Sequence, residues 1–350
     1  MPSTDGSARP RHLGDLPTPA LVIDVDVLDA NLRTMAAVHP GAALRPHVKA
    51  HKCTSLARQQ AAHGHTSFTC ATPREVIGMA RAGLGADLLL ANEVVDPRRL
   101  AAMATAARET GAVITVAVDS AETIAAAADA GLSSVLLDVD VGLPRCGCAV
   151  DDAGRLADLA RARGLEVRGV MGYEGHLMVP ADGDDPDGHR RRVDEAIDRL
   201  LVAHAAVGGD VVSSGGTGTH HLHRLRPGVT EVQAGSYALM DSHYGTHGHP
   251  FGQACHVIGT VISVGRRHAV ADVGLKAMGM DHGNPTTSAG AVWFLSDEHL
   301  TFAPASTAAV GDRIGVVPAH IDPTMAMHED AWLVRGDEVI DRWPIDLRGW

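Results

Sequence analysis

The chain has 350 residues, of which 45% are hydrophobic and 21% are charged, and a formal net charge of −12. This length exceeds one average domain, and the composition is typical of a soluble globular protein. The acidic balance and the absence of a basic run argue against nucleic acid binding, and no apolar stretch approaches the roughly 18 residues of a membrane span.

Targeting and redox signals are also weak. Residues 1–17 are polar and contain no apolar signal core, so the sequence predicts a cytoplasmic protein that makes no membrane contact. The chain has an odd number of cysteines, five, at spacings that match no zinc ribbon. We expect them to be reduced thiols.

Up to about residue 240, short apolar runs alternate with alanine-rich helical patterns. Strands are predicted at 21–24, 44–48, 66–70, 86–91, 113–118, 135–140, 167–172, 211–214 and 230–234. Helices are predicted at 73–82, 96–108, 120–130, 151–163 and 187–206. Fully apolar strands that repeat every ~20–25 residues indicate a parallel sheet covered by helices, and eight or nine units favour a closed (β/α)₈ barrel. Nine runs is one too many, and the pattern does not say which to exclude.

The pattern changes after Asp241. Alternating strand patterns occur at 257–264, 268–273, 292–295, 300–303 and 313–317, and a hairpin is predicted from 332–335 and 338–343 around Gly336. All four tryptophans lie in this region. Large aromatic side chains suit a small domain that fills its core with few residues. The sequence therefore predicts a barrel followed by a C-terminal β domain.

Lysine is rare in this chain, and two of the three lysines lie between Arg45 and Lys52. Lys49 follows the run 44–48, which places it at the mouth of a barrel strand, where barrel enzymes carry catalytic groups. His47 precedes it by two residues and faces the same way in a strand. A partly desolvated lysine forms a Schiff base, whereas arginine does not. An arginine-rich codon bias and a structural role for Lys49 are the alternatives. Lys52 is expected to be exposed at a helix start.

A glycine-rich segment follows the run 211–214, and a second small-residue turn follows the next run. Backbone N–H groups in such loops bind anions, although a tight turn without a ligand is the alternative. In barrels, a phosphate site commonly follows a late strand. A Schiff-base lysine together with a phosphate loop indicates pyridoxal 5′-phosphate. The candidate residues of the two turns are Gly216, Thr217, Gly218, Thr219, Gly235, Ser236 and Tyr237.

His320 and Asp322 follow a predicted strand and are separated by one residue. On an extended segment the two side chains point the same way, so they can bind one divalent cation and leave coordination positions open. The bare pattern is common and carries little weight alone. A second candidate metal cluster consists of His243, His247 and His249.

Three further residues follow predicted strands. Arg145 is a candidate hydrogen-bond donor to the phenolic oxygen of the cofactor, unless Asp138 and Asp140 are simply its ion-pair partners. Tyr173 and His176 are candidates for orienting the cofactor ring and for acting as a base. The sequence suggests no role for Lys276 or Asp281.

Several motifs resemble those of the alanine racemase-like, fold type III pyridoxal phosphate enzymes, and most closely their D-threonine aldolase and D-serine dehydratase branch. They are Thr18-Pro-Ala-Leu-Val-Ile-Asp24, Arg45-Pro-His-Val-Lys49-Ala-His-Lys52, Asp138-Val-Asp-Val-Gly-Leu-Pro-Arg145-Cys-Gly147, Gly215-Gly-Thr-Gly-Thr219, Gln233-Ala-Gly-Ser-Tyr237 and Pro318-Ala-His320-Ile-Asp322-Pro-Thr324.

This resemblance implies a cofactor bound through Lys49, a phosphate held by the glycine loop and a divalent metal at His320 and Asp322. It also implies that the first strand belongs to the β domain, so that residues 26–244 form the barrel, and residues 1–25 with 245–350 form the β domain. A homodimer is expected on the same grounds.

Within this branch, a His-x-Asp pair is typical of the aldolases and a His-x-Cys pair of the dehydratases. The harder pair suits manganese, magnesium or cobalt, with zinc as the alternative. The resemblance thus implies an aldolase that cleaves D-3-hydroxy-amino acids of the D-threonine type to glycine and an aldehyde. The alternatives are a D-serine or D-3-hydroxyaspartate dehydratase, a non-catalytic pyridoxal phosphate carrier, and a sugar-phosphate barrel enzyme that uses Lys49 without a cofactor.

Overall fold

The computed structural model describes residues 10–181, 183 and 185–350. Two compact units are present: a barrel unit of Leu32–Tyr237 with Asp346–Trp350, and a β unit of the residues up to Asn31 with Ala238–Ile345. Residues 346–350 thus pack with the barrel unit, although the sequence analysis assigned them to the β domain. The prediction that residues 1–25 belong to the β domain falls partly on residues 1–9, which lie outside the described residues, as does part of the polar segment 1–17.

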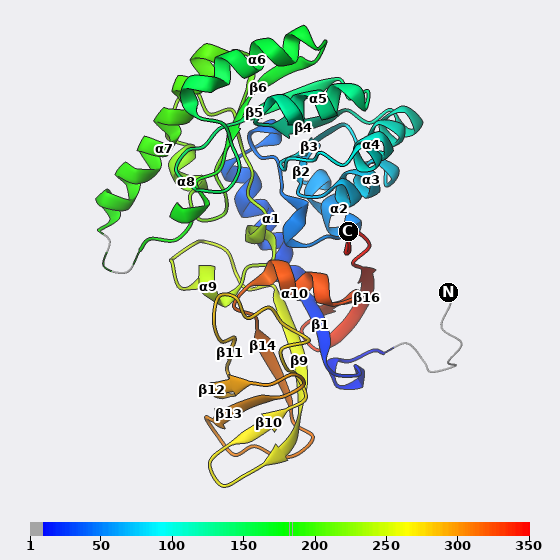
Figure 1. The fold of residues 1–350 in the computed structure, drawn as a ribbon. Helices are drawn as coiled ribbons and strands as arrows, with labels where there is room; N and C mark the ends of the chain where they lie inside the picture. Colours follow the sequence, from blue (N-terminus) through cyan, green and yellow to red (C-terminus); the bar gives the residue numbers. More distant parts are fainter. Residues whose placement is uncertain (1–9, 182, 184) are drawn as a thin grey trace. The chain divides into compact units, whose positions relative to one another are not determined.

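The barrel unit is organised around a parallel sheet of seven strands in sequence order (Figure 1). The strands are β2 (Ser67–Cys70), β3 (Asp87–Leu90), β4 (Ile114–Val118), β5 (Ser134–Asp138), β6 (Glu166–Gly172), β7 (Val211–Ser214) and β8 (Glu231–Val232). The predicted strand 44–48 joins the two edges through single bridges, from Leu44 to Val232 and from His47 to Thr69. The eight-membered barrel predicted from the sequence is therefore confirmed.

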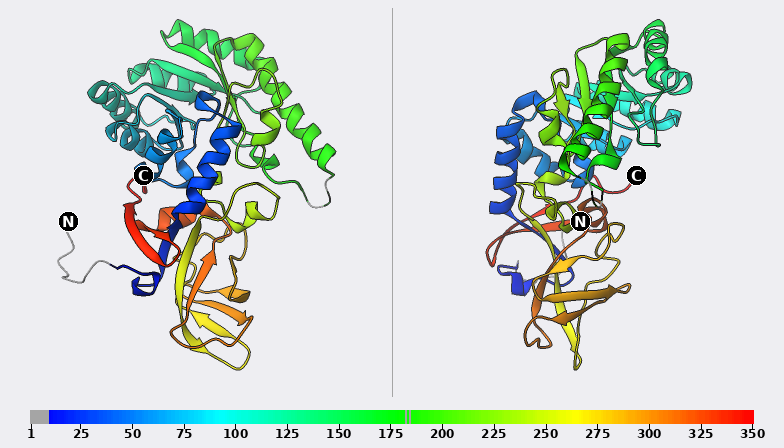
Figure 2. Two further views of the ribbon diagram at one scale, coloured as in Figure 1. Left: turned by 180° about the vertical axis from the view of Figure 1, so that it is seen from behind. Right: turned by 90° about the vertical axis from the view of Figure 1, so that its left-hand side faces the viewer.

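The helices of this unit follow one another around the outside of the sheet (Figures 1 and 2). They are α2 (Thr54–Ala62), α3 (Pro73–Arg81), α4 (Pro97–Thr110), α5 (Ala121–Asp129), α6 (Ala153–Ala162), α7 (Pro186–Val207) and the short α8 (His220–His223). Local sequence explains several starts: Thr72, Asp96 and Asp185 each cap a helix with a side-chain oxygen and are followed by proline at the first helical position.

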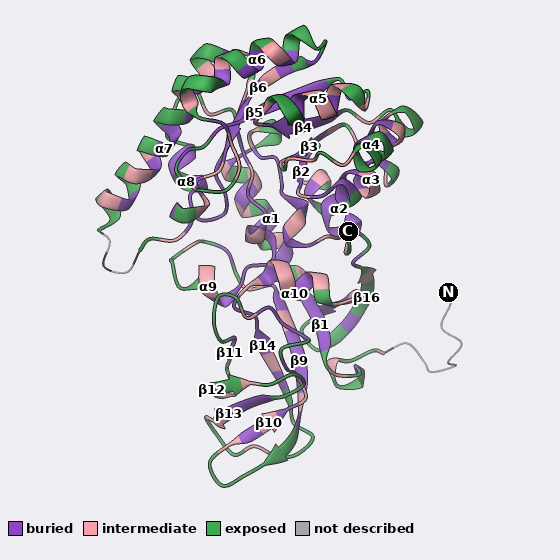
Figure 3. Cartoon of the chain, viewed as in Figure 1, coloured by how far each residue is buried: buried purple, intermediate pink, exposed green. Residues whose placement is uncertain are grey.

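Alternating side chains of the strands pack on opposite faces of the sheet. In β3, Leu88 and Leu90 join the cluster that includes the outer helices, whereas Leu89 packs inside with Ala117 and Leu136. Both faces are buried, as the purple strands in Figure 3 show. This double burial explains the continuous apolar runs in the sequence, since each such side chain contributes about 1.5–3 kcal/mol when fully buried.

The β unit contains a nine-stranded sheet in the order β10-β13-β12-β11-β14-β9-β1-β15-β16, and a further β10–β9 pairing closes its first six strands into a small barrel. The strands are β1 (Ala20–Asp24), β9 (Cys255–Val264), β10 (Ala269–Ala271), β11 (Thr286–Thr287), β12 (Gly290–Leu295), β13 (Leu300–Pro304), β14 (Arg313–Val317), β15 (Asp330–Arg335) and β16 (Glu338–Pro344). The helix α1 (Val25–Val38) begins in this unit, which also contains α9 (Ser242–Gly245) and α10 (Ile321–Met327).

Two details of the β unit bear on the predictions. Strand β1 pairs with β9 and β15, so the first apolar run belongs to this sheet and not to the barrel. The hairpin β15–β16 turns at Gly336, whose φ of 57° suits glycine. Both features agree with the sequence analysis, whereas β11 was not predicted.

All five cysteines are free, and four of them are buried. In the part of the chain that the structure describes, no helix combines the length and apolarity that a membrane crossing requires.

Candidate functional site

Lys49 lies in a single turn of 3₁₀ helix, Val48–Ala50, directly after the segment that closes the barrel. Its backbone N–H donates to Nδ1 of His47 at 3.4 Å. Burial and the neighbouring charge of Lys49 hold the pKa of His47 well below its usual value, so the imidazole is neutral and can accept. The backbone of Lys49 thus lies at the mouth of the barrel, as predicted.

The ring of Tyr173 connects several of the predicted cofactor residues. Nζ of Lys49 lies 5.7 Å from the ring centroid, and Cζ of Arg145 lies 5.3 Å from it. Cε2 of the same ring would be 3.4 Å from a Cβ atom built on Gly216. Residues that follow four different strands of the barrel therefore meet around one aromatic ring.

The glycine loop is buried throughout residues 216–219. Gly218 is required by packing, because a Cβ atom there would lie 1.7 Å from the carbonyl oxygen of Met178. Among the described residues, however, the backbone N–H groups of Thr217 and Gly218 meet no acceptor. Buried N–H groups are rarely left unpaired, so their presence here fits a loop that receives an anion.

The second turn joins both the glycine loop and the lysine turn. The N–H of Tyr237 donates to Oγ1 of Thr217 at 3.0 Å, and the Tyr237 hydroxyl accepts from Gln60 at 3.1 Å. A Cβ atom on Gly235 would lie 2.6 Å from the carbonyl oxygen of His47. Ser236 therefore lies in a turn that contacts both the glycine loop and the segment that precedes Lys49.

Glu174 is a buried member of the site that the sequence analysis did not select. Its carboxylate accepts from the Thr219 hydroxyl and from Nε2 of His223, both at 2.6 Å, and from the Gly215 N–H at 3.3 Å. Burial alone would raise the pKa of Glu174, but His223 and Thr219 lower it to about 2. Its position between Tyr173 and His176 in the sequence was the available signal.

Three further residues of the sequence analysis, Asp138, Asp140 and His176, lie near this group along the chain. Among the described residues no ion pair within 4.0 Å joins Arg145 to Asp138 or Asp140, although the charge of Arg145 acts on Asp138. Burial, and then Glu93, raise the pKa of Asp138 well above its usual value. His176 is exposed, and its Cε1 would lie 3.3 Å from a Cβ atom on Gly142.

The expectation that Lys52 is exposed is wrong. Its ammonium group pairs with Glu75, and the side chains of Lys52 and Glu75 are 14% and 0% exposed. Lys52 is also one of two described non-glycine residues with positive φ, at 48°. Its N–H donates to Val48 at 2.7 Å, and its carbonyl accepts from Leu347 at 2.9 Å. The turn that contains Lys49 is therefore closed and anchored by Lys52.

In the β unit, three candidate metal ligands lie together: Asp281, His282 and His320 have ligand atoms within 4.8 Å of one another. Nδ1 of His320 bonds Oδ2 of Asp281 at 2.6 Å, and the rings of His282 and His320 stack at 4.0 Å. Imidazole and carboxylate together are a donor set that suits divalent transition metals. The role of Asp281 was not found from the sequence because 38 residues separate it from His320.

His320 and Asp322 do not lie on one extended segment, so that part of the prediction is wrong. His320 has extended backbone at φ −139°, but it is the N-cap of α10, so Asp322 lies in the first turn of a helix. Asp322 nevertheless acts electrostatically on both His282 and Asp241, which places it in the same neighbourhood. Burial is the largest cause that lowers the pKa of His282, which favours the neutral form that binds metals.

The second histidine cluster is partly joined to this group. The ring of His243 lies 4.6 Å from that of His282 and 5.7 Å from that of His247. His249 contacts the ring of Tyr244 at 6.0 Å. Lys276 is exposed, with Glu298 and Asp297 at 3.6 and 3.8 Å. Its contacts with the described residues suggest no catalytic role.

Comparisons with known proteins find similarity along most of the chain. Residues 23–243 match the family model of the alanine racemase N-terminal domain, and residues 254–334 match that of a putative serine dehydratase domain. The chain is 34% identical to D-threonine aldolase of Arthrobacter sp, over 96% of this chain and 94% of that one. It is 28% identical to D-threo-3-hydroxyaspartate dehydratase of Delftia sp. (strain HT23), over 96% and 98% of the chains.

A solved structure is similar over nearly the whole length. The crystal structure of D-threonine aldolase from Filomicrobium marinum superposes with a TM-score of 0.91 at 32% identity, over 98% of this chain and 99% of that one. The similarity therefore covers both the barrel unit and the β unit.

Proposed function

Because the chain belongs to the alanine racemase-like, fold type III family, in the branch of D-threonine aldolase and D-serine dehydratase, we propose that it is a pyridoxal phosphate-dependent lyase that cleaves D-3-hydroxy-α-amino acids to glycine and an aldehyde. The observation that carries this proposal is the meeting of Lys49, Arg145 and the glycine loop around Tyr173.

The residues of the barrel unit fit the cofactor. Lys49 would hold its aldehyde carbon, and the unpaired N–H groups of Thr217 and Gly218 would receive its phosphate. Arg145 and Tyr173 would orient the ring. When bound, the pyridinium ring stores the electron pair that remains on Cα after the Cα–Cβ bond breaks.

Proton transfer balances the reaction without any oxidation or reduction. A base takes the proton of the β-hydroxyl group, the Cα–Cβ electrons remain with the glycine fragment, and Cα then receives a proton. We assign His176 as a candidate base and Lys49 as a candidate donor to Cα, since both follow barrel strands. The neutral state of His47 avoids a second positive charge next to Lys49.

In the β unit, His320 and Asp322 would bind a divalent metal, for which manganese is our first choice, with magnesium, cobalt and zinc as alternatives. A bound metal lowers the pKa of a coordinated hydroxyl group. Asp281 accepts a hydrogen bond from Nδ1 of His320, which leaves Nε2 as the donor atom for the metal. Asp281 would thus fix both the tautomer and the direction of the ring.

The test is a product analysis with purified protein, pyridoxal phosphate and Mn²⁺. D-Threonine should give equal amounts of glycine and acetaldehyde, and L-threonine should give neither. A dehydratase, which the Delftia relative supports, would instead release ammonia and 2-oxobutanoate. Formation of the keto acid as the main product would overturn the aldolase proposal and leave the cofactor site intact.

Cofactor binding distinguishes the aldolase from a pyridoxal phosphate carrier and from a sugar-phosphate enzyme. Bound cofactor without turnover of any D-3-hydroxy-amino acid would favour the carrier, and a colourless protein that never binds pyridoxal phosphate would favour the sugar-phosphate enzyme. Removal of metal with a chelator should abolish aldol cleavage, and Mn²⁺ should restore it. We also propose a cytoplasmic homodimer, for which light scattering at several protein concentrations is the test of oligomeric state.

A further inference from the structure

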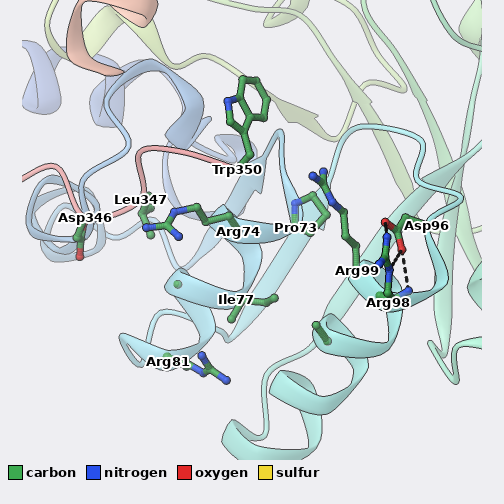
Figure 4. A pocket seen from close by; sticks show the side chains of 12 residues that line it. Pro73, Arg74, Ile77, Arg81, Asp96, Arg98, Arg99, Asp346, Leu347 and Trp350 are labelled. Carbon is green, nitrogen blue, oxygen red and sulfur yellow. Dashed lines mark hydrogen bonds and ion pairs between the residues drawn. The ribbon is translucent and has the colours of Figure 1, made fainter. Parts of the chain in front are cut away.

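A pocket of about 600 Å³ lies on the barrel unit between the outer helices α3 and α4 and residues 346–350 (Figure 4). Its volume falls within the range of small-molecule sites, roughly 300–1,000 Å³. None of the predicted cofactor or metal residues lines it. The aldolase proposal therefore leaves this pocket without a role.

The side chains that line the pocket include four arginines and two aspartates. Four arginines line it: Arg98 pairs with Asp96 at 3.3 Å, and Arg81 lies 3.5 Å from Glu109. Arg74 and Arg99 have no carboxylate partner among the described residues. In a chain with a net charge of −12, two unpaired guanidinium groups at one cavity indicate an anionic ligand.

The second acid in the pocket does not neutralise these arginines. Asp346 lines the cavity, but its carboxylate accepts from the N–H of Thr54 at 2.9 Å and from the Thr54 hydroxyl at 2.5 Å. It is therefore committed to capping α2. The two unpaired arginines keep their capacity for bidentate contacts with a phosphate or carboxylate.

A large aromatic surface borders the same cavity. Trp350 is 86% exposed, and Figure 4 shows its indole ring above Arg74 and Pro73, with Arg99 on the other side of that proline. Ile77 and Ala102 add apolar surface to the lining. An exposed tryptophan next to arginines can stack on a planar ring while the guanidinium groups bind an anion on the same ligand.

We propose that this pocket binds a phosphate monoester that carries a planar aromatic ring, of the nucleoside monophosphate type. Arg74 and Arg99 contact the phosphate, and Trp350 stacks on the ring. The pocket is separate from the cofactor residues around Tyr173. The proposal therefore does not depend on which reaction the enzyme catalyses.

The wall of the pocket is connected to the lysine turn. Leu347, which lines the cavity, donates its N–H to the carbonyl of Lys52 at 2.9 Å, and its side chain is 2% exposed in the barrel core. A Cβ atom on Gly78 would lie 2.3 Å from Cδ2 of Leu347, so glycine makes room for this contact. A ligand that holds residues 346–350 should thus slow hydrogen exchange at Leu347.

The test is isothermal titration of the cofactor-loaded protein with adenosine 5′-monophosphate, adenosine and inorganic phosphate in parallel. We expect the monophosphate to bind at least about tenfold more tightly than either part, because it makes both the charge-assisted and the stacking contacts. Arg74→Ala with Arg99→Ala should weaken binding at least about tenfold. Trp350→Phe should retain more affinity than Trp350→Ala.

Controls make the result decisive. Arg108→Ala removes an exposed arginine of α4 that does not line the pocket, so affinity should be unchanged. Melting temperatures establish that each variant folds. Absence of saturable binding at millimolar monophosphate would overturn the proposal, as would equal binding by the double arginine variant. Loss of the visible cofactor band during the titration would mean binding at the cofactor phosphate site, which also overturns it.

Discussion

The turn that carries Lys49 and the cluster around His320 are built in contrasting ways. In the barrel unit, the turn is anchored by Lys52, whose ammonium group pairs with a fully buried Glu75. In the β unit, His320 is 21% exposed and its partner Asp281 is 56% exposed. The turn that carries Lys49 is thus fixed by a buried ion pair, whereas the cluster around His320 is open to solvent.

This contrast has a physical cause in chain connectivity. The motif between Arg45 and Lys52 crosses the barrel: Arg45 is 2% exposed and binds Glu231 and Asp87, both at 2.7 Å, while Lys49 emerges past the other end. Burial would raise the pKa of Asp87, but Arg168 and Arg45 lower it to about 2. A strand fixed by buried charge at one end and by Lys52 at the other positions the lysine between them.

The largest expected effect is at Lys49 itself. Lys49→Arg should reduce kcat/KM by about 10³-fold or more and remove the visible absorbance of lysine-bound cofactor, because a guanidinium is never neutral. Steady-state kinetics and an absorbance spectrum measure both. Lys276→Arg is the matched control, since that lysine is exposed. A persistent cofactor band that borohydride reduction maps away from residue 49 would contradict the assignment.

The buried ion pair of Lys52 and Glu75 should contribute more to the stability of the protein than an exposed ion pair does. Glu75→Gln leaves the ammonium of Lys52 largely buried without a counter-charge, so the free energy of unfolding should fall by about 3–5 kcal/mol. Urea unfolding measures this difference. The control Glu298→Gln removes one partner of the exposed Lys276 and should change stability by roughly 0–1 kcal/mol. Equal losses in the two variants would show that burial does not distinguish these pairs.

The open cluster should respond through metal affinity. Asp281→Asn weakens the acceptor for Nδ1 of His320, so Mn²⁺ should bind about 10–100-fold more weakly, with little change in melting temperature. Isothermal titration of the protein with Mn²⁺ measures this affinity without any activity assay. Asp297→Asn, an exposed acid of the same unit, should leave the affinity unchanged. An unaltered affinity in Asp281→Asn would remove the positioning role of Asp281.

The smallest effect concerns pH. The pKa of Glu174 is depressed to about 2 from a usual 4.5, so its contribution to stability is complete above pH 4.5 and is lost as the pH falls toward 2. Melting temperatures of the wild type should therefore fall over this window. Glu174→Gln should lose part of this dependence. Parallel curves for the two proteins would exclude Glu174 as a source of acid sensitivity.

The barrel was predictable because its signals are local. A strand such as β7 was located to the residue, since Val211–Ser214 is a short apolar run followed by a glycine turn. The closing segment 44–48 was found from the same pattern, although it pairs only through single bridges. Likewise, the residues around Tyr173 each follow a strand, and parallel strands of a barrel bring all such positions to one mouth.

Other features were decided by tertiary structure. Lys52 was predicted to be an exposed helix-start residue, because no pattern near it in the sequence indicates that Glu75 is its partner. Asp281 reaches His320 across 38 intervening residues, and Asp322 lies on a helix where an extended segment was expected. Residues 346–350 pack with the barrel unit, where Asp346 caps α2 at Thr54. Asp346, Leu347 and Trp350 line the pocket between α3 and α4.

The sequence by itself determined the fold class of this protein and located Lys49 and the glycine loop directly after predicted barrel strands. Strand periodicity and loop composition depend on adjacent residues. Only the tertiary structure decided which charges are buried and which carboxylate bonds to His320. It also decided that Arg74, Arg99 and Trp350 line one pocket. The physical reason is that burial and ion pairing depend on contacts between residues far apart in the chain, whose energies no local pattern encodes.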